Sequence, residues 1–178
     1  DRKFKDSLAG RKKLFELYTL DFDEFLDFRS DNAELSSELI RIRENGNYLS
    51  LRRNEIELLF SEYLTYGGYP AVVLAQTADL KKEKLKELIQ SYVKRDILDS
   101  NISDPDKFFR LMLLLSHQTG SLVNVNELSA TLKLSVTAVE NYLFILQKCF
   151  HVHLLRPFYQ NIRKELTKMP KAYFHDTG

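Results

Sequence analysis

Apolar residues recur at intervals of three and four along most of this chain, which is the period of an amphipathic helix. The segment 54–66 is a clear example, with Ile56, Leu59, Phe60, Tyr63 and Leu64 on one face. The same spacing predicts further helices over residues 22–28, 34–44, 80–99, 107–117, 127–132 and 136–150. In residues 72–75 the apolar run is too short to distinguish helix from strand. We therefore predict a mainly α protein.

Alternating patterns at the two ends of the chain predict strands instead. Residues 14–20 alternate apolar and polar positions near the N-terminus. Residues 152–158 and 171–174 follow three helices that are joined by short turns. Three such helices and a strand pair are typical of a winged helix-turn-helix. Residues 159–170, between the strands, would then form the wing.

Capping signals mark where several helices begin and end. Asp21 and Glu24 have the spacing of a capping box, and Asp104-Pro105 and Ser135 are typical helix starts. The most distinctive end is Gly67-Gly68-Tyr69-Pro70, because glycine accepts a positive φ and proline then fixes φ and removes a donor. Spacing alone is equally compatible with an ordinary glycine cap and with a functional turn.

Composition limits the classes of protein to which the chain can belong. The 178 residues are 44% hydrophobic and 29% charged, as in globular proteins, and the net charge of +1 gives no global attraction for nucleic acid. A single cysteine, Cys149, rules out an intramolecular disulfide and favours a reducing, cytoplasmic location. No apolar run reaches the length of a membrane span.

The order of short motifs resembles prokaryotic AAA-type ATPases of the signal-transduction-like branch, which carry a C-terminal domain of unknown function. In that family a winged helix leads into a restriction-endonuclease-like region. The motifs are residues 7–11 (SLAGR), 15–20 (FELYTL), 22–26 (FDEFL), 66–70 (YGGYP), 94–97 (KRDI), 119–120 (TG), 142–143 (YL) and 171–178 (KAYFHDTG). Together they extend over nearly the whole chain.

The resemblance implies that the chain is an internal fragment of an ATP-binding protein. Residues 1–30 would be a remnant of the ATPase core, residues 31–78 a helical lid, and residues 79–178 the helical and winged-helix C-terminal domain. The chain contains no Gly-x-x-x-x-Gly-Lys-Ser/Thr motif to hold a triphosphate, so ATP, with Mg, would bind only in the full-length protein. The fragment would not be catalytic alone; it would act as a nucleotide-gated switch or an interaction module.

The same resemblance assigns candidate roles to individual residues. Pro70, with Gly68, would contact the adenine. Arg11 lies where related enzymes place a nucleotide-sensing arginine, although a surface arginine after a glycine cap is an equal alternative. Arg95 and Asp96 match the family pattern and could form an interdomain ion pair. From the helical pattern alone, Asp96 points to the apolar face and needs a partner, in an ion pair, a cap or a site.

Two alternatives belong to other functional classes. A DNA-binding regulator would use the wing, because five Lys or Arg stand against two Asp or Glu from His151 onward, while the last helix offers few groups that read bases. The cations of the wing itself are Arg163, Lys164, Lys168 and Lys171. A protein-interaction module, or self-association, would instead use exposed aromatics such as Phe158 and Tyr159.

Other candidate features have simpler explanations. The lysines at positions 81, 82, 84 and 86 are expected on a solvated helix face. His151, His153 and His175 would come together on the strand pair, but no cysteine cluster supports a zinc site, and we predict no metal. Cys149 reads as a small apolar residue on the core side of the last helix.

Overall fold

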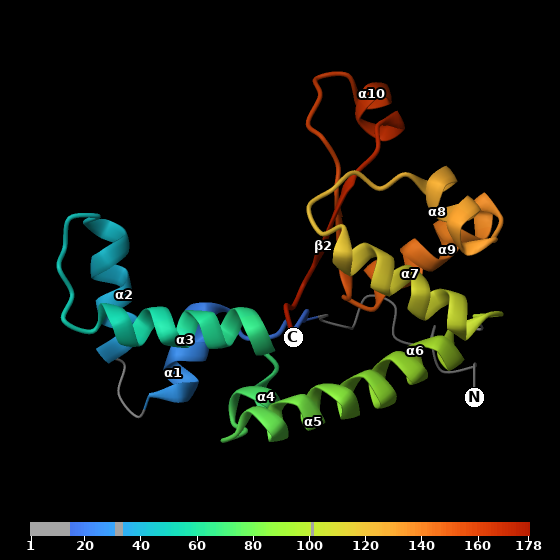
Figure 1. The fold of residues 1–178 in the computed structure, drawn as a ribbon. Coiled ribbons are helices and arrows are strands. Elements are labelled where there is room, and N and C mark those ends of the chain that lie inside the picture. The colour runs from blue at the N-terminus through green and yellow to red at the C-terminus, as the bar shows by residue number, and fades with distance from the viewer. Residues whose placement is uncertain (1–14, 31–33, 101) are drawn as a thin grey trace.

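The computed structural model describes residues 15–30, 34–100 and 102–178, which form two lobes (Figure 1). The N-terminal lobe contains α1 (Phe22–Arg29), α2 (Glu34–Glu44), α3 (Arg53–Tyr66) and α4 (Pro70–Val73). The C-terminal lobe contains α7 (Pro105–His117), α8 (Val125–Leu132), α9 (Val136–Lys148), β1 (Val152–Leu155), α10 (Ile162–Thr167) and β2 (Lys171–Phe174). The prediction of a mainly α chain with a small two-stranded sheet is confirmed.

One long helical run connects the lobes. It consists of α5 (Ala78–Leu88), a π-helical segment η2 (Ile89–Val93) and α6 (Lys94–Asp99), where the sequence predicted a single helix over 80–99. Thr77 caps its start by accepting a hydrogen bond from the Leu80 N–H. The run begins against α4 in the N-terminal lobe, and Ile97 near its end is buried in the core of the C-terminal lobe.

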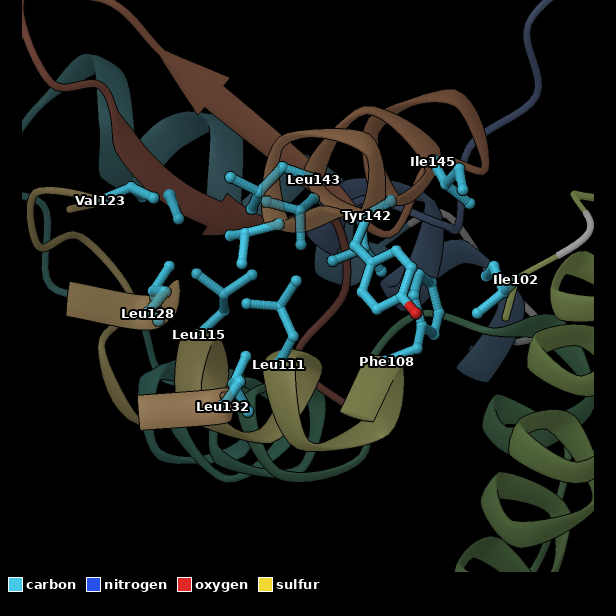
Figure 2. Close-up of a cluster of buried hydrophobic side chains, with 14 of the residues drawn as sticks. Ile102, Phe108, Leu111, Leu115, Val123, Leu128, Leu132, Tyr142, Leu143 and Ile145 are labelled. Atoms are coloured by element: carbon cyan, nitrogen blue, oxygen red, sulfur yellow. The ribbon is translucent and has the colours of Figure 1, made fainter. Parts of the chain in front are cut away.

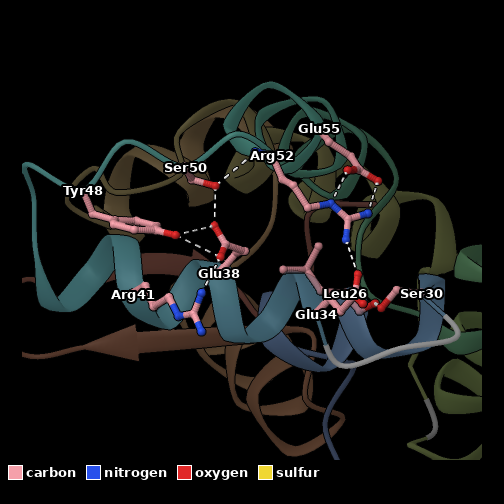
Figure 3. A network of polar contacts seen from close by, with 9 residues as sticks. All are labelled: Leu26, Ser30, Glu34, Glu38, Arg41, Tyr48, Ser50, Arg52 and Glu55. Carbon is pink, nitrogen blue, oxygen red and sulfur yellow. Dashed lines mark hydrogen bonds and ion pairs between the residues drawn. The ribbon is translucent and has the colours of Figure 1, made fainter.

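The N-terminal lobe is organised around a small apolar cluster between its helices. Its buried members are Phe25, Leu26, Leu35, Leu39, Ile56 and Val73. Both hydrogen bonds of the predicted Asp21–Glu24 capping box are present and fix the start of α1. Glu38 on α2 accepts hydrogen bonds from Tyr48 and Ser50, which holds the loop between α2 and α3 against α2 (Figure 3).

The C-terminal lobe has the larger core, which includes Phe108 and Leu111 of α7 and Tyr142 of α9 (Figure 2). Tyr142 is almost completely buried, and its hydroxyl lies 3.3 Å from the Asp104 nitrogen, so the polar end of the ring is satisfied where α7 begins. The predicted caps are present, since Asp104 and Ser135 accept hydrogen bonds from early N–H groups of α7 and α9.

The sheet is antiparallel and pairs Val152 with Phe174 and Leu155 with Lys171. The predicted first strand, 152–158, is therefore too long, because Pro157 lacks an N–H and the chain leaves the ladder after Leu155. The residues between the strands, 156–170, are called the hairpin loop below, and the short helix α10 lies within them.

The predicted strand over 14–20 is wrong for the residues that the structure describes. Residues 15–20 form no regular strand, and Leu17 is 94% exposed. A strand needs a neighbour to accept and donate its hydrogen bonds, whereas this segment bonds to the rest of the chain mainly at its last residue, Leu20. Residues 4–10, where the sequence FKDSLAG predicts a short helix ending at a glycine cap, and Leu14 lie outside the described residues.

Candidate functional site

The turn that follows α3 has a backbone conformation open only to glycine. Gly67 has φ 74° and ψ −171°, and its N–H donates to the Tyr63 oxygen at 2.8 Å. A side chain at that φ and ψ would meet the backbone on both sides. Gly67 therefore ends α3 sharply and turns the chain into α4, as the glycine cap read from the sequence requires.

Two segments that are distant in sequence are bound to the next residue, Gly68. The Leu20 N–H donates to the Gly68 oxygen at 2.9 Å, and the Gly68 N–H donates to a carboxylate oxygen of Asp176 at 2.8 Å. The tail that carries Asp176 extends directly from β2 to the end of α3, where the C-terminal residue lies (Figure 1). We call the contact between residues 18–20, 67–68 and 175–178 the glycine junction.

Further hydrogen bonds hold the tail and Leu20 in place. Tyr63 donates from its hydroxyl to the Leu20 oxygen at 3.1 Å and accepts at its backbone oxygen from the Thr177 hydroxyl at 3.1 Å. The Asp176 carboxylate also accepts from the Gly178 N–H at 2.9 Å. Burial raises the pKa of Tyr63, and the negative charge of Asp176 acts in the same direction. The phenol is therefore a neutral donor at neutral pH.

Space at the junction excludes any side chain at either glycine. A Cβ on Gly67 would lie 1.8 Å from an Asp176 carboxylate oxygen and 2.7 Å from the Gly178 nitrogen. A Cβ on Gly68 would lie 2.1 Å from the Leu20 oxygen. Both glycines are thus needed for the close approach of other chain segments, in addition to the φ that Gly67 requires.

An aromatic group covers one side of the junction. The Tyr18 ring stacks on His175 at a centroid distance of 5.3 Å and meets Phe150 edge-on at 5.5 Å. Burial lowers the pKa of His175, and the neighbouring His153 and His151 lower it further. The neutral ring is therefore favoured in the stack. Among the described residues, no group of three or more His, Cys, Asp or Glu is arranged to hold a metal ion.

A buried lysine joins α4, which follows the turn, to α3 in the N-terminal lobe. Lys81 is only 4% exposed, so its expected place on a solvated face is wrong. Its ammonium donates to the Val72 oxygen at 2.9 Å and lies 3.0 Å from a Glu62 carboxylate oxygen. Arg29 contacts the other oxygen of Glu62 at 3.3 Å. The charge is stable there because it is paired with the Glu62 carboxylate and bonded to a carbonyl group of α4.

The residues predicted to contact the nucleotide have different surroundings in the structure. Gly68 is buried and both of its backbone polar groups are bonded within the chain, whereas Pro70 is exposed at the first position of α4. Arg11 lies outside the described residues. Arg95 is 78% exposed at its side chain and lies 3.7 Å from Asp99 on the same helix. The side chain of Asp96 is outside the described part, so the interdomain ion pair stays a prediction.

The cations of the hairpin loop and β2 face solvent. Arg163, Lys168 and Lys171 are exposed, and Lys164 has a side chain outside the described part. On α9, Asn141 and Gln147 are exposed, as expected for the outer face of that helix. The hairpin loop with α10 lies at the end of the strand pair opposite to the C-terminal tail and the glycine junction (Figure 1).

Sequence reasoning missed Leu20 and Asp176 of the junction, and the buried Lys81 between α3 and α4. Asp176 and Leu20 lie inside motifs that carry the family resemblance, but no local pattern indicates that they bind Gly68. The pair Gly67-Gly68 was the available signal, since two successive glycines allow two backbones to approach closely.

Comparison with known proteins gives a family that carries no functional description. A family model described as "Domain of unknown function (DUF8612)" matches residues 57–178. The chain belongs to this family. The DUF8612 match begins within α3 and includes both Gly68 and Asp176, while Leu20 precedes it. No solved structure matches the chain.

Curated relatives are also uncharacterised. An uncharacterised protein of Haemophilus influenzae is 28% identical over 96% of this chain and 40% of its own length. The uncharacterised protein MJ1544 of Methanocaldococcus jannaschii is 24% identical over 88% of this chain and 34% of its own length. The chain thus spans well under half the length of these relatives. Among the described residues, no helix is sufficiently long and apolar to cross a membrane.

Proposed function

We propose that this chain is the coupling part of a larger prokaryotic ATP-binding protein and acts as a nucleotide-gated switch. The observation that supports this most is the position of Gly68, which is hydrogen-bonded to Leu20 on one side and to Asp176 on the other. Leu20 belongs to the segment that resembles the end of an ATPase core. Asp176 lies two residues beyond β2.

A displacement of the turn at Gly68 would therefore act on both Leu20 and Asp176. If ATP, held with Mg by an upstream core, contacts Pro70, closure of the lid pulls on α4 and on Gly68. A shift of Gly68 by about an ångström would stretch its 2.8 Å hydrogen bond to Asp176. Because Asp176 follows β2 after one residue, the shift would also act on that strand. A ligand shifts such an equilibrium only by binding one arrangement more tightly than the other. The exposed ring of Pro70 is the part of the turn left open for that contact.

The test uses the longer parent protein that contains the upstream segment. Pro70→Ala is expected to weaken ATP binding and hydrolysis, and unchanged values would exclude the adenine contact. Asp176→Ala is expected to leave ATP affinity close to that of the parent and to abolish the coupling between the turn at Gly68 and the C-terminal lobe. Asp106→Ala, which removes an exposed carboxylate on α7, is the matched control.

The coupling can be measured as a nucleotide-dependent change in the distance between the two lobes. Spin labels at the exposed positions Glu57 on α3 and Arg163 on α10, in a parent protein whose native cysteines, Cys149 included, are replaced by serine, report the separation of the lobes with and without nucleotide. We expect a nucleotide-dependent change of distance that Asp176→Ala removes and Asp106→Ala keeps. The same distance in all nucleotide states would refute the switch even if ATP binds.

A DNA-binding regulator is the second candidate. It is supported by the exposed cations Arg163, Lys168 and Lys171 at the hairpin end of the C-terminal lobe. This function predicts binding to duplex DNA that weakens steeply as salt is raised, with a slope reduced by about one for each phosphate-binding lysine replaced. Absence of a DNA complex at low salt rules it out for this chain.

A further inference from the structure

A cavity of about 370 Å³ lies on the solvent face of the sheet, beneath the hairpin loop. Its floor contains Leu155 of β1, Lys171 of β2, and Leu122, which forms a bridge to Lys171 from the segment after α7. Tyr159 and Met169 of the hairpin loop complete the apolar wall. A volume of this size falls within the range of about 300–1,000 Å³ that is usual for binding pockets.

The charged side chains that line the cavity are all positive. Arg156, Lys168 and Lys171 line it, and no Asp or Glu is among its described lining residues. Arg156 donates to the Leu166 oxygen at 3.0 Å, a neutral partner, so its positive charge is not neutralised by that bond. An occupant must therefore combine an apolar side chain for the floor with negative charge at the edge.

We propose that this cavity binds an extended segment of a protein partner in which large apolar side chains are flanked by Asp or Glu. The proposal concerns a different site from the glycine junction and does not depend on nucleotide gating. Tyr, Met and Arg, which are enriched at the centres of protein interfaces, all line the cavity. An apolar floor with half-exposed leucines is also poorly suited to a phosphate backbone, which DNA would present.

Further large apolar side chains are exposed in the hairpin loop outside the cavity, which favours a peptide over a small molecule. Phe158 is 88% exposed in the loop that lines the cavity, and Ile162 and Leu166 of α10 are 72% and 61% exposed. Arg156 ties the end of α10 to the loop through Leu166. Large apolar side chains exposed together in one loop are typical of an interaction site, and their spread over residues 158–166 suits a chain segment better than a compact ligand.

The first experiment selects binders from a random dodecapeptide display library on the immobilised 178-residue chain. We expect enrichment of Phe, Leu or Ile next to Asp or Glu. Selected peptides, labelled with fluorescein, are then titrated by fluorescence anisotropy. Met169→Glu and Lys168→Glu are each expected to weaken binding by at least about tenfold, since each adds a negative charge where the peptide's own charge would lie.

Matched controls separate the cavity from general charge effects. Lys148→Glu makes the same charge change at an exposed position on α9 and should leave peptide affinity within about twofold. Lys168 is exposed in a loop, so its replacement tests the site even if Met169→Glu disturbs folding. Enrichment without acidic residues, or equal affinity of Lys168→Glu and Lys148→Glu, would overturn the proposal. So would binding of duplex DNA at this site, or self-association of the chain that Lys168→Glu abolishes, in place of peptide binding.

Discussion

Replacing Gly68 with alanine is the sharpest test of the glycine junction. The added Cβ would lie 2.1 Å from the Leu20 oxygen, so Leu20 must move by more than 1 Å to restore the 3.4 Å of ordinary contact. That oxygen is a backbone atom, and it cannot rotate away as the end of a side chain could. The shift would also strain the 2.9 Å bond from the Leu20 N–H to the Gly68 oxygen and the bond from the Tyr63 hydroxyl.

The expected cost follows from these contacts. Overpacking in a closed site costs about 1–3 kcal/mol, and each weakened hydrogen bond adds about 1 kcal/mol. Alanine also restricts the unfolded chain, which offsets about 0.4–1 kcal/mol of this loss. We therefore expect Gly68→Ala to lower the free energy of unfolding by about 2–4 kcal/mol.

The matched control is Gly46→Ala, because a Cβ on Gly46 meets nothing within 4 Å. Gly46→Ala restricts the unfolded chain to the same degree but introduces no clash. The difference between the two variants in the free energy of unfolding therefore measures the cost of the clash at the junction. Urea unfolding followed by far-UV circular dichroism gives both free energies. Hydrogen exchange should show faster exchange of the Leu20 amide in Gly68→Ala only. Equal unfolding midpoints for the two variants would refute the close packing described for the junction.

Two further predictions concern the buried Lys81 and the titration of His175. Lys81→Met leaves the half-buried Glu62 with one cation instead of two, so we expect a loss of about 2–3 kcal/mol in the free energy of unfolding, while Lys82→Met on the exposed face should change it by less than about 0.5 kcal/mol. Equal losses for the two lysine variants would contradict the buried contact. The folded pKa of His175 lies below its usual value of 6.5, so its contribution to stability is complete above pH 6.5 and is lost as the pH falls below it. Unfolding measured from pH 7.5 to 5 should show this decline, and His175→Gln should flatten it; an equally steep decline in the variant would show that other groups are responsible.

Local signals in the sequence predicted the helices well. Asp21, Asp104 and Ser135 each accept from an N–H three residues away, so both partners of the cap are visible in a short stretch of sequence. The glycine cap after α3 is equally local. Apolar spacing predicted most helix positions for the same reason. The buried face of a helix is determined by residues three and four apart, which lie within a few turns of one another.

The junction could not be predicted in this way. Asp176 and Gly68 are 108 residues apart, and nothing in either neighbourhood specifies the other. Residues 15–20 alternate like a strand, yet a strand exists only if a second strand lies beside it, and the pattern contains no information about that neighbour. Lys81 belongs to a run of similar lysines, and only the position of the α4 carbonyl groups distinguishes it from Lys82.

The helical run from Ala78 to Asp99 is the second link between the lobes, apart from the glycine junction. Two rigid bodies fastened at two separate points keep one free rotation, about the line through both fastenings. Sliding of one lobe past the other, and rotation about any other axis, are then blocked while both links hold. With the whole glycine junction released, the C-terminal lobe would move on the helix alone, and the π-helical turn at Ile89–Val93 is the natural place for that helix to bend. The glycine junction thus sets how many directions of movement the lobes have.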